Sequence, residues 1–143
     1  MILLDTTVLA YAAGTEHALR APCRGLLEAV SDGRLEATTT PEVIQEFVHV
    51  RSRRSSRVDA AARGRELARL LRPLISPGEA ELLLGMRLFE EHEAIGAFDA
   101  VLAATAILSG ADALVSADHA FGRLPRLRHV DPATPAIWQL IEG

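Results

Sequence analysis

The chain has 143 residues and a mass of 15.4 kDa, with 49% hydrophobic residues, 24% charged residues and a net charge of −4. These proportions exclude a disordered chain, and the length suits a single domain over residues 1–143. A lone cysteine, Cys23, excludes a disulfide framework and a cysteine-based zinc site. We expect a soluble, cytoplasmic protein without membrane association, because the chain shows neither a signal-peptide pattern nor a membrane-spanning apolar stretch.

The basic residues are unevenly distributed along the chain. All 15 are arginine, and eight of them lie between residues 51 and 72 with only Asp59 and Glu66 as acidic neighbours. Such a basic segment on an acidic chain is typical of a surface that binds a phosphate backbone, and equally typical of a solvated helix face. The candidate nucleic-acid contacts in this segment are Arg51, Arg53, Arg54 and Arg57.

Short apolar runs alternate with helical patterns along the chain. The expected elements, in chain order, are strand Ile2–Leu4, helix Val8–Ala13, helix His17–Ser31, strand Leu35–Thr39, a helix from Thr40–Pro41 to about Arg51, helix Val58–Leu71, strand Leu74–Ile75, a helix from a capping box at Ser76–Glu79 to about Glu91, helix Phe98–Leu108, strand Ala113–Val115, strand Arg128–Val130 and a short helix carrying Trp138. This alternation predicts an α/β fold with a mostly parallel sheet, in which ligands bind beyond the carboxyl ends of the strands.

Four carboxylates are placed to meet at that edge. Asp5 directly follows the first strand, and Asp118 follows the strand Ala113–Val115 by three residues. Glu46 lies on the helix after the second strand, and Asp99 opens an otherwise apolar helix. Carboxylates beside buried apolar residues are costly unless they are paired or bound to a metal. Because the chain has no lysine to pair with them, their hard oxygen ligands indicate Mg²⁺ or Mn²⁺.

Each carboxylate also has a purely structural interpretation. Asp5 is suited to cap the helix that follows it. Asp99 is suited to the first turn of its own helix, where an acidic side chain interacts favourably with the helix dipole. Glu46 is typical of a solvated helix position, and Asp118 of an Asx turn. The prediction of a metal site therefore depends on the joint placement of the four residues.

Other phosphate and hydrolase chemistries lack their motifs in this chain. The glycine-rich dinucleotide fingerprint is absent, and a P-loop or a receiver-type phosphoryl site needs a lysine. A dehalogenase-type phosphatase needs a second aspartate where Thr7 stands. Neither a Gly-x-Ser-x-Gly elbow nor a His-Glu-x-x-His pattern occurs.

The four acidic segments resemble the motifs of PIN-domain ribonucleases. They read Ile-Leu-Leu-Asp5-Thr-Thr-Val-Leu, Val-Ile-Gln-Glu46-Phe, Phe-Asp99-Ala-Val-Leu-Ala-Ala-Thr-Ala and Leu-Val-Ser-Ala-Asp118-His-Ala-Phe. The resemblance spans essentially the whole chain. In size, order and spacing the segments are most similar to the VapC toxins of bacterial toxin–antitoxin pairs.

This resemblance implies a PIN-like three-layer α/β/α fold and a set of site residues. The catalytic residues it implies are Asp5, Glu46, Asp99 and Asp118. Of these, Asp5, Asp99 and Asp118 would bind Mg²⁺ or Mn²⁺, and Glu46 would act through water. Thr7 and Ser116 match supporting polar positions. Glu42 lies one turn before Glu46, so the second acid of the site is either of the two, with Glu46 favoured.

The resemblance also implies a function and partners. We expect the toxin of a type II toxin–antitoxin pair, a homodimeric endoribonuclease that cleaves structured RNA such as tRNA or rRNA loops and is held inactive by its antitoxin. The arginine segment would then contact RNA. The alternatives are a PIN nuclease of RNA maturation and a non-catalytic module that binds RNA or protein. Small and apolar residues at Ala60–Ala62, Leu67, Leu70 and Leu71 suit either a groove for an antitoxin helix or the core.

Overall fold

A parallel four-stranded sheet forms the centre of the computed structural model, which describes residues 1–143. The strands are β1 (Ile2–Leu4), β2 (Ala37–Thr38), β3 (Leu114–Val115) and β4 (His129–Val130). Their order across the sheet is β2-β1-β3-β4, and Leu3 of β1 is in register with Thr38 on one side and Leu114 on the other. Because every pair is parallel, all four carboxyl ends lie at one edge.

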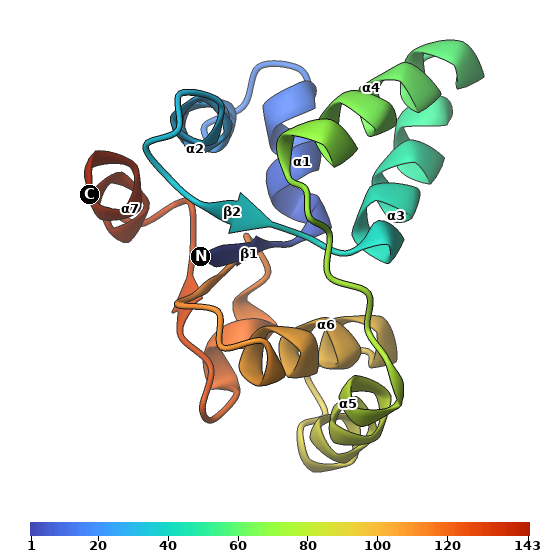
Figure 1. Ribbon diagram of the computed structural model, residues 1–143, viewed down its shortest axis with the longest axis vertical. Coiled ribbons are helices and arrows are strands. Elements are labelled where there is room, and N and C mark those ends of the chain that lie inside the picture. The colour runs from blue at the N-terminus through green and yellow to red at the C-terminus, as the bar shows by residue number, and fades with distance from the viewer.

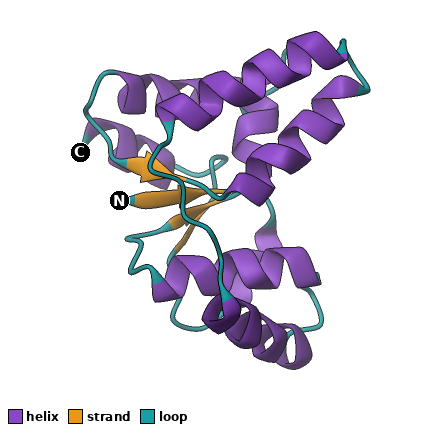
Figure 2. Ribbon diagram, turned by 45° about the vertical axis from the view of Figure 1, so that its right-hand side comes forward, coloured by secondary structure: helices purple, strands orange, loops and turns teal.

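Helices cover both faces of this sheet and complete a three-layer α/β/α fold (Figures 1 and 2). The helices are α1 (Thr6–Ala13), α2 (Arg20–Ser31), α3 (Pro41–Ser52), α4 (Arg57–Leu70), α5 (Glu79–Glu91), α6 (Ala97–Leu108) and α7 (Ala136–Glu142), with a 3₁₀ helix at His119–Arg123. Helices α1 to α4 lie on one side of the sheet, α5 and α6 lie on the other, and α7 packs against α2. The predicted α/β architecture with a parallel sheet is therefore confirmed.

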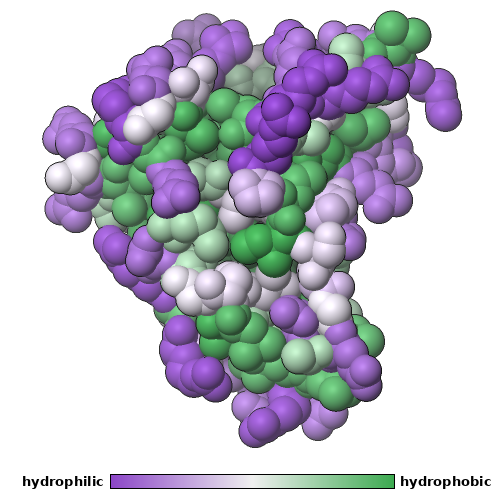
Figure 3. Space-filling model, in the orientation of Figure 1, coloured by the Kyte–Doolittle hydropathy of each residue, from purple (hydrophilic) through white to green (hydrophobic).

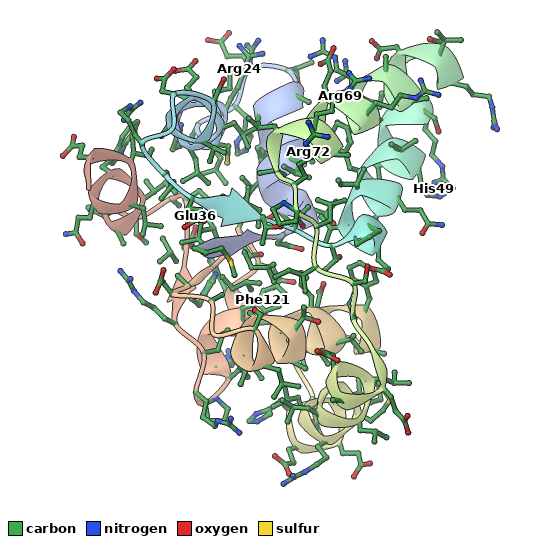
Figure 4. The ribbon with its side chains drawn as sticks, viewed as in Figure 1. Arg24, Glu36, His49, Arg69, Arg72 and Phe121 are labelled. Atoms are coloured by element: carbon green, nitrogen blue, oxygen red, sulfur yellow. The ribbon has the colours of Figure 1, made fainter.

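The core lies between the sheet and its two helical layers. The two central strands, β1 and β3, are short and consist of buried apolar residues, as expected for parallel strands that are buried on both faces. Phe121 of the 3₁₀ helix is fully buried, and Figure 4 shows it between the sheet and α6. Thr39, which directly follows β2, is a buried polar residue whose hydroxyl donates to the Leu4 carbonyl at 2.7 Å. This bond fixes the end of β1, from which Asp5 follows.

Two predictions about the middle of the chain are wrong. Leu74–Ile75 is not a strand, because only one ladder-like bond forms there, from the Ile75 amide to the Thr39 carbonyl at 3.0 Å. The capping box expected at Ser76–Glu79 lies two residues further on. Gly78 is the N-cap of α5, and its amide donates to the Glu81 carboxylate at 3.0 Å.

Other helix ends agree with the sequence pattern or differ slightly from it. Thr40 caps α3 and accepts a hydrogen bond from the Val43 amide at 3.2 Å. Helix α2 begins at Arg20 rather than at His17, where the ring nitrogen instead accepts from the Leu19 amide. None of the helices combines the length and apolar character that a bilayer crossing requires.

Candidate active site

Asp5 lies buried at the carboxyl end of β1, at the first residue before α1. It occupies the N-cap position of α1 but its side chain makes no capping bond, so the capping interpretation is wrong. Its carboxylate instead accepts from the Ser116 hydroxyl at 2.6 Å and from the Thr7 hydroxyl at 3.1 Å. Only 4% of Asp5 is exposed, and these two hydroxyl donors fix the orientation of the carboxylate within the sheet edge.

Thr7 and Ser116 join the ends of β1 and β3. The Thr7 hydroxyl accepts from the Ala117 amide at 2.9 Å and lies 3.4 Å from the Ser116 hydroxyl. The Ser116 hydroxyl also accepts from the Asp118 amide at 3.0 Å. One chain of hydrogen bonds therefore connects Asp5, Thr7, Ser116 and the backbone of Asp118. The structure thus places both predicted supporting residues against Asp5.

Glu46 is held beside the same edge from α3. The Thr6 hydroxyl donates to its carboxylate at 2.8 Å across a sequence separation of 40 residues. Glu42, one turn earlier, makes no such bond and lines a different groove, between α3, α5 and α6, with Phe98. Of the two glutamates that the sequence left open, Glu46 is therefore the one placed near Asp5.

Asp99 lies in the first turn of α6 and is half-buried. Burial, followed in decreasing order by the negative charges of Asp5, Asp118 and Glu46, raises the pKa of its carboxyl to about 7. Its electrostatic coupling to the other three acids identifies all four as one cluster.

Asp118 is exposed and precedes the 3₁₀ helix. One carboxylate oxygen accepts from the Ala120 amide at 2.9 Å, so the turn interpretation holds for that oxygen. The neighbouring His119 pairs with Asp131 at 3.0 Å and takes no part in the cluster. Asp118 is therefore both a turn residue and a member of the acidic site.

The donor set suits a hard divalent cation. Four carboxylates meet at an edge that carries hydroxyl donors and no ion-paired cation: none of the five ion pairs of the structure includes Asp5, Glu46, Asp99 or Asp118. A cation would relieve the repulsion that raises the pKa of Asp99. No group of three acidic or imidazole side chains is arranged to hold an ion at once, so coordination of one ion by all three aspartates would require side chains to move.

The cluster lies where the starts of α1, α3 and α6 approach the carboxyl edge of the sheet (Figure 1). In Figure 3 the right-hand outline of the molecule is indented between α3 above and α6 below. Two helical layers therefore flank the acidic edge and leave it open to solvent.

The four candidate RNA-binding arginines differ in their surroundings. Arg51 donates to the Ala13 carbonyl at 2.7 Å and to Asp59 at 3.2 Å, so its guanidinium ties α3 to α1 and α4. Arg53, Arg54 and Arg57 are exposed and have no ion-pair partner. The structure thus separates one structural arginine from three free ones.

Sequence reasoning missed two residues that position the site. Thr6 holds Glu46, and its place beside Asp5 was the available signal. His129 of β4 lies 2.7 Å, through Nε2, from the Ser116 carbonyl, and its ring packs near Phe121. No local pattern indicates the His129 contact, because it depends on the pairing of β3 with β4.

These features define a PIN-type acidic site on an α/β sheet, and comparison with known proteins agrees. The PIN domain family matches residues 2–127. Ribonuclease VapC7 of Mycobacterium tuberculosis is 54% identical over 142 residues, which cover 99% of this chain and 98% of that protein. Ribonuclease VapC23 of the same species is 31% identical over 121 residues, covering 83% and 94%. The chain therefore belongs to the PIN-domain family.

Solved structures share the fold at low sequence identity. VapBC2 from Rickettsia felis, crystallised with a promoter DNA fragment, has a TM-score of 0.72 at 21% identity and covers 92% of this chain and 98% of its own. VapC20 of M. tuberculosis, described as a toxin that cleaves the sarcin–ricin loop, has a TM-score of 0.70 at 16% identity, with 85% and 93% covered. The three-layer fold is thus the one found in VapC toxins.

Proposed function

We propose that this protein is the toxin of a type II toxin–antitoxin pair and hydrolyses phosphodiester bonds in RNA with Mg²⁺ or Mn²⁺ at the four-carboxylate cluster. The observation that carries the proposal is the coupling of Asp99 to Asp5, Asp118 and Glu46 at one sheet edge. Identity of 54% to a VapC ribonuclease over the full length supports it. A purely binding module has no need for four mutually repelling acids.

Each site residue has a defined part in this reaction. Asp5, Asp99 and Asp118 would hold the ion, and Thr7 and Ser116 keep the Asp5 carboxylate in place through their hydroxyls. A bound divalent ion lowers the pKa of water and neutralises charge on the scissile phosphate. Glu46, held by Thr6, is placed to orient the attacking water and accept its proton. The family resemblance implies that the 3′ oxygen is the leaving group, which would give 5′-phosphate and 3′-hydroxyl ends.

A groove between α1, α2 and α4 suits an antitoxin helix. It has a volume of about 430 Å³ and is lined by Leu27, Leu67 and Leu70 with Arg24 and Arg63 at its polar margin. The predicted groove residues Leu67 and Leu70 are half-buried there, whereas Leu71 and Ala60 are fully buried in the molecule. We assign this groove to an apolar antitoxin segment whose basic end reaches the acidic cluster.

The opposite helical layer suits a second copy of the chain. Large apolar side chains are exposed on α5 and α6, with Leu82, Leu83, Phe89 and Phe98 between 42% and 58% accessible. Exposed apolar residues on neighbouring helices mark protein interfaces. We propose that residues 1–143 form one domain, that two copies associate through this layer, and that the dimer works in the cytoplasm.

Incubation of the purified protein with total tRNA and rRNA tests the proposed reaction. Cleavage is expected with Mg²⁺ or Mn²⁺, and none is expected with EDTA. Asp5→Asn and Asp99→Asn should each abolish cleavage while circular dichroism stays unchanged. Cleavage that persists in EDTA, or full activity of either variant, would contradict the proposed function.

A further inference from the structure

We propose that a polar groove between the outer faces of α3 and α4 holds the RNA strand next to the scissile phosphate. The inference rests on the proposed ribonuclease function and names the path of its substrate. The groove has a volume of about 590 Å³. Its polar lining consists of Gln45, His49 and Ser52 from α3 with Arg57 and Arg65 from α4.

Helix α3 makes this groove continuous with the acidic cluster. His49 lies three residues after Glu46, so these two side chains are neighbours on the helix surface, and Gln45 directly precedes Glu46 in the sequence. The groove reaches Ser52, which is about 9 Å further along the helix axis at 1.5 Å per residue. Figure 4 shows His49 on the side of α3 that faces away from the sheet. A strand that leaves the cluster along α3 therefore enters the groove.

The groove is basic and its arginines are free. Arg57 and Arg65 are exposed, form no ion pair and donate no hydrogen bond within the chain. Glu66 directly follows Arg65 but lines the groove on the other side of α4. Asp59, two residues after Arg57, is engaged by Arg51 at 3.2 Å and by Ser55 at 2.7 Å. No carboxylate lines the groove. Two uncompensated guanidinium groups are thus available, and guanidinium groups bind phosphates with two parallel hydrogen bonds.

The position of Arg65 shows why the groove differs from the other side of the same helix. Arg63, two residues earlier, faces the α1–α2 groove with Leu67 and lies 3.9 Å from Asp59. Arg65 faces His49 and Gln45. Helix α4 therefore divides its arginines between a half-apolar groove, suited to a protein helix, and a polar groove beside the acids, suited to a polyanion.

The remaining lining suits single-stranded RNA rather than a uniformly acidic peptide. Val48, Val58 and Ala61 add apolar surface between the polar groups. The Gln45 amide offers both a donor and an acceptor, the combination that reads base edges. A strand that presents phosphates, sugars and base edges satisfies all three kinds of group, whereas a run of carboxylates satisfies only the arginines.

Two double variants with equal charge change test the assignment. Arg57→Ser with Arg65→Ser removes the groove cations, and Arg53→Ser with Arg54→Ser removes two free cations at the tip of the α3–α4 hairpin. Both are made in full-length Asp99→Asn protein so that RNA is not cut. Binding of a fluorescein-labelled 12-nucleotide RNA of mixed sequence is measured by anisotropy over a range of salt, with thermal unfolding as the check on folding.

We expect the groove variant to bind at least tenfold more weakly and to lose about 1.4 from the slope of log affinity against log salt, about 0.7 per lost phosphate contact on a single strand. The tip variant should lose less than threefold. In protein with intact acids, the groove variant should raise KM and leave kcat unchanged. Lysine at both groove positions should restore part of the affinity.

Equal losses in the two double variants would overturn the inference, because general electrostatic attraction would then explain both. A second result would also overturn it. Poly-glutamate would displace the RNA from the parent protein, and the groove variant would lose as much affinity for poly-glutamate as for RNA, so the groove would bind an acidic peptide equally well. A failure of the ribonuclease function is separately visible, since the unsubstituted chain would then not cut RNA under any metal condition, whether or not it binds RNA.

Discussion

At the residue scale, Asp99 is where burial and repulsion combine most strongly. Its pKa is about 7 in the folded chain against an ordinary value of 3.8. The folded state therefore holds a proton between these values that the unfolded chain has released. The protonated Asp99 carboxyl thus favours the folded state. This contribution to the free energy of unfolding is complete below about pH 4 and is lost as the pH rises through about 7.

The first prediction concerns this loss in metal-free protein. Asp99→Asn should remove the loss of stability at high pH and raise the free energy of unfolding at pH 8 by about 1–2 kcal/mol. This value is smaller than the full pKa shift of Asp99 would give, because the carboxyl is half-exposed and solvent screens it. Urea denaturation in EDTA at pH 5 and pH 8 measures the difference. Asp32→Asn, at an exposed surface pair, is the control. If Asp99→Asn and the unsubstituted chain differ equally at both pH values, the raised pKa of Asp99 is wrong.

The second prediction separates the two glutamates of α3. Glu46→Gln should lower RNA cleavage by about 10²-fold, because it removes the group placed to accept a proton from water. Glu42→Gln changes the same chemistry one turn away and should lower it less than threefold. Initial rates at saturating Mg²⁺ give the comparison. The reverse ranking would move the second acid of the site to Glu42.

The positions of site residues relative to the sheet edge could be predicted from the sequence where a local pattern determined them. Asp5 follows an apolar strand, and Asp99 opens an apolar helix, so both positions relative to the sheet edge were readable. The bond from Thr6 to Glu46 was not, because it joins residues 40 positions apart. The structural use of Arg51 was missed for the same reason, since its acceptor at Ala13 is contributed by α1.

At the element scale, α6 carries Asp99 and depends on α5 for its position. Gly85 of α5 allows the two helices to approach closely. A Cβ at this position would lie 2.7 Å from the Val101 Cγ2 atom and 2.9 Å from its Cα atom. The second of these atoms is backbone, so the helices would have to move apart.

The third prediction follows from this contact. Gly85→Ala should destabilise the fold by about 1–3 kcal/mol, although alanine favours helix more than glycine does. Gly25→Ala in α2 is the matched control, because its new Cβ meets only side-chain atoms at 3.4 Å or more. Thermal unfolding of both variants decides. A Gly85→Ala variant as stable as Gly25→Ala would show that the α5–α6 packing is looser than described.

The order and type of most elements were predictable from apolar periodicity, whereas their ends were not. The helix starting at Thr40 was identified by its cap, and the structure has that cap. Strand β1 has its predicted ends, whereas the other three strands are shorter than expected, because tertiary pairing rather than apolar content sets their ends. Leu74–Ile75 has strand composition but pairs through one bond only, and such a segment remains a loop.

At the scale of the whole molecule, the two helical layers have different proposed partners. The groove between α1, α2 and α4 faces one way, and the exposed apolar side chains of α5 and α6 lie on the other side of the sheet. A toxin needs both an inhibitor and an accessible site. Separate surfaces allow the antitoxin to be exchanged without separating the two copies.

The fourth prediction tests this division in cells. Expression of the chain alone should arrest growth, and co-expression of the adjacent small reading frame should restore it. Leu70→Arg, in the groove, should stay toxic and escape rescue, whereas Leu83→Arg, on α5, should weaken dimerisation and still be rescued. Growth curves and co-purification report the outcome. A chain that cleaves RNA yet never arrests growth would instead be a PIN nuclease of RNA maturation.

In the proposed site, Asp5, Asp99 and Asp118 hold a divalent cation and Glu46 acts through water. Titration with Mn²⁺, followed by the electron paramagnetic resonance signal of the free ion, measures binding directly. The unsubstituted chain should take up Mn²⁺ at submillimolar concentration, and Asp5→Asn or Asp99→Asn should weaken this uptake at least tenfold, while Asp32→Asn leaves it unchanged. Uptake that is absent in the unsubstituted chain, or equal in all four proteins, would contradict the claim.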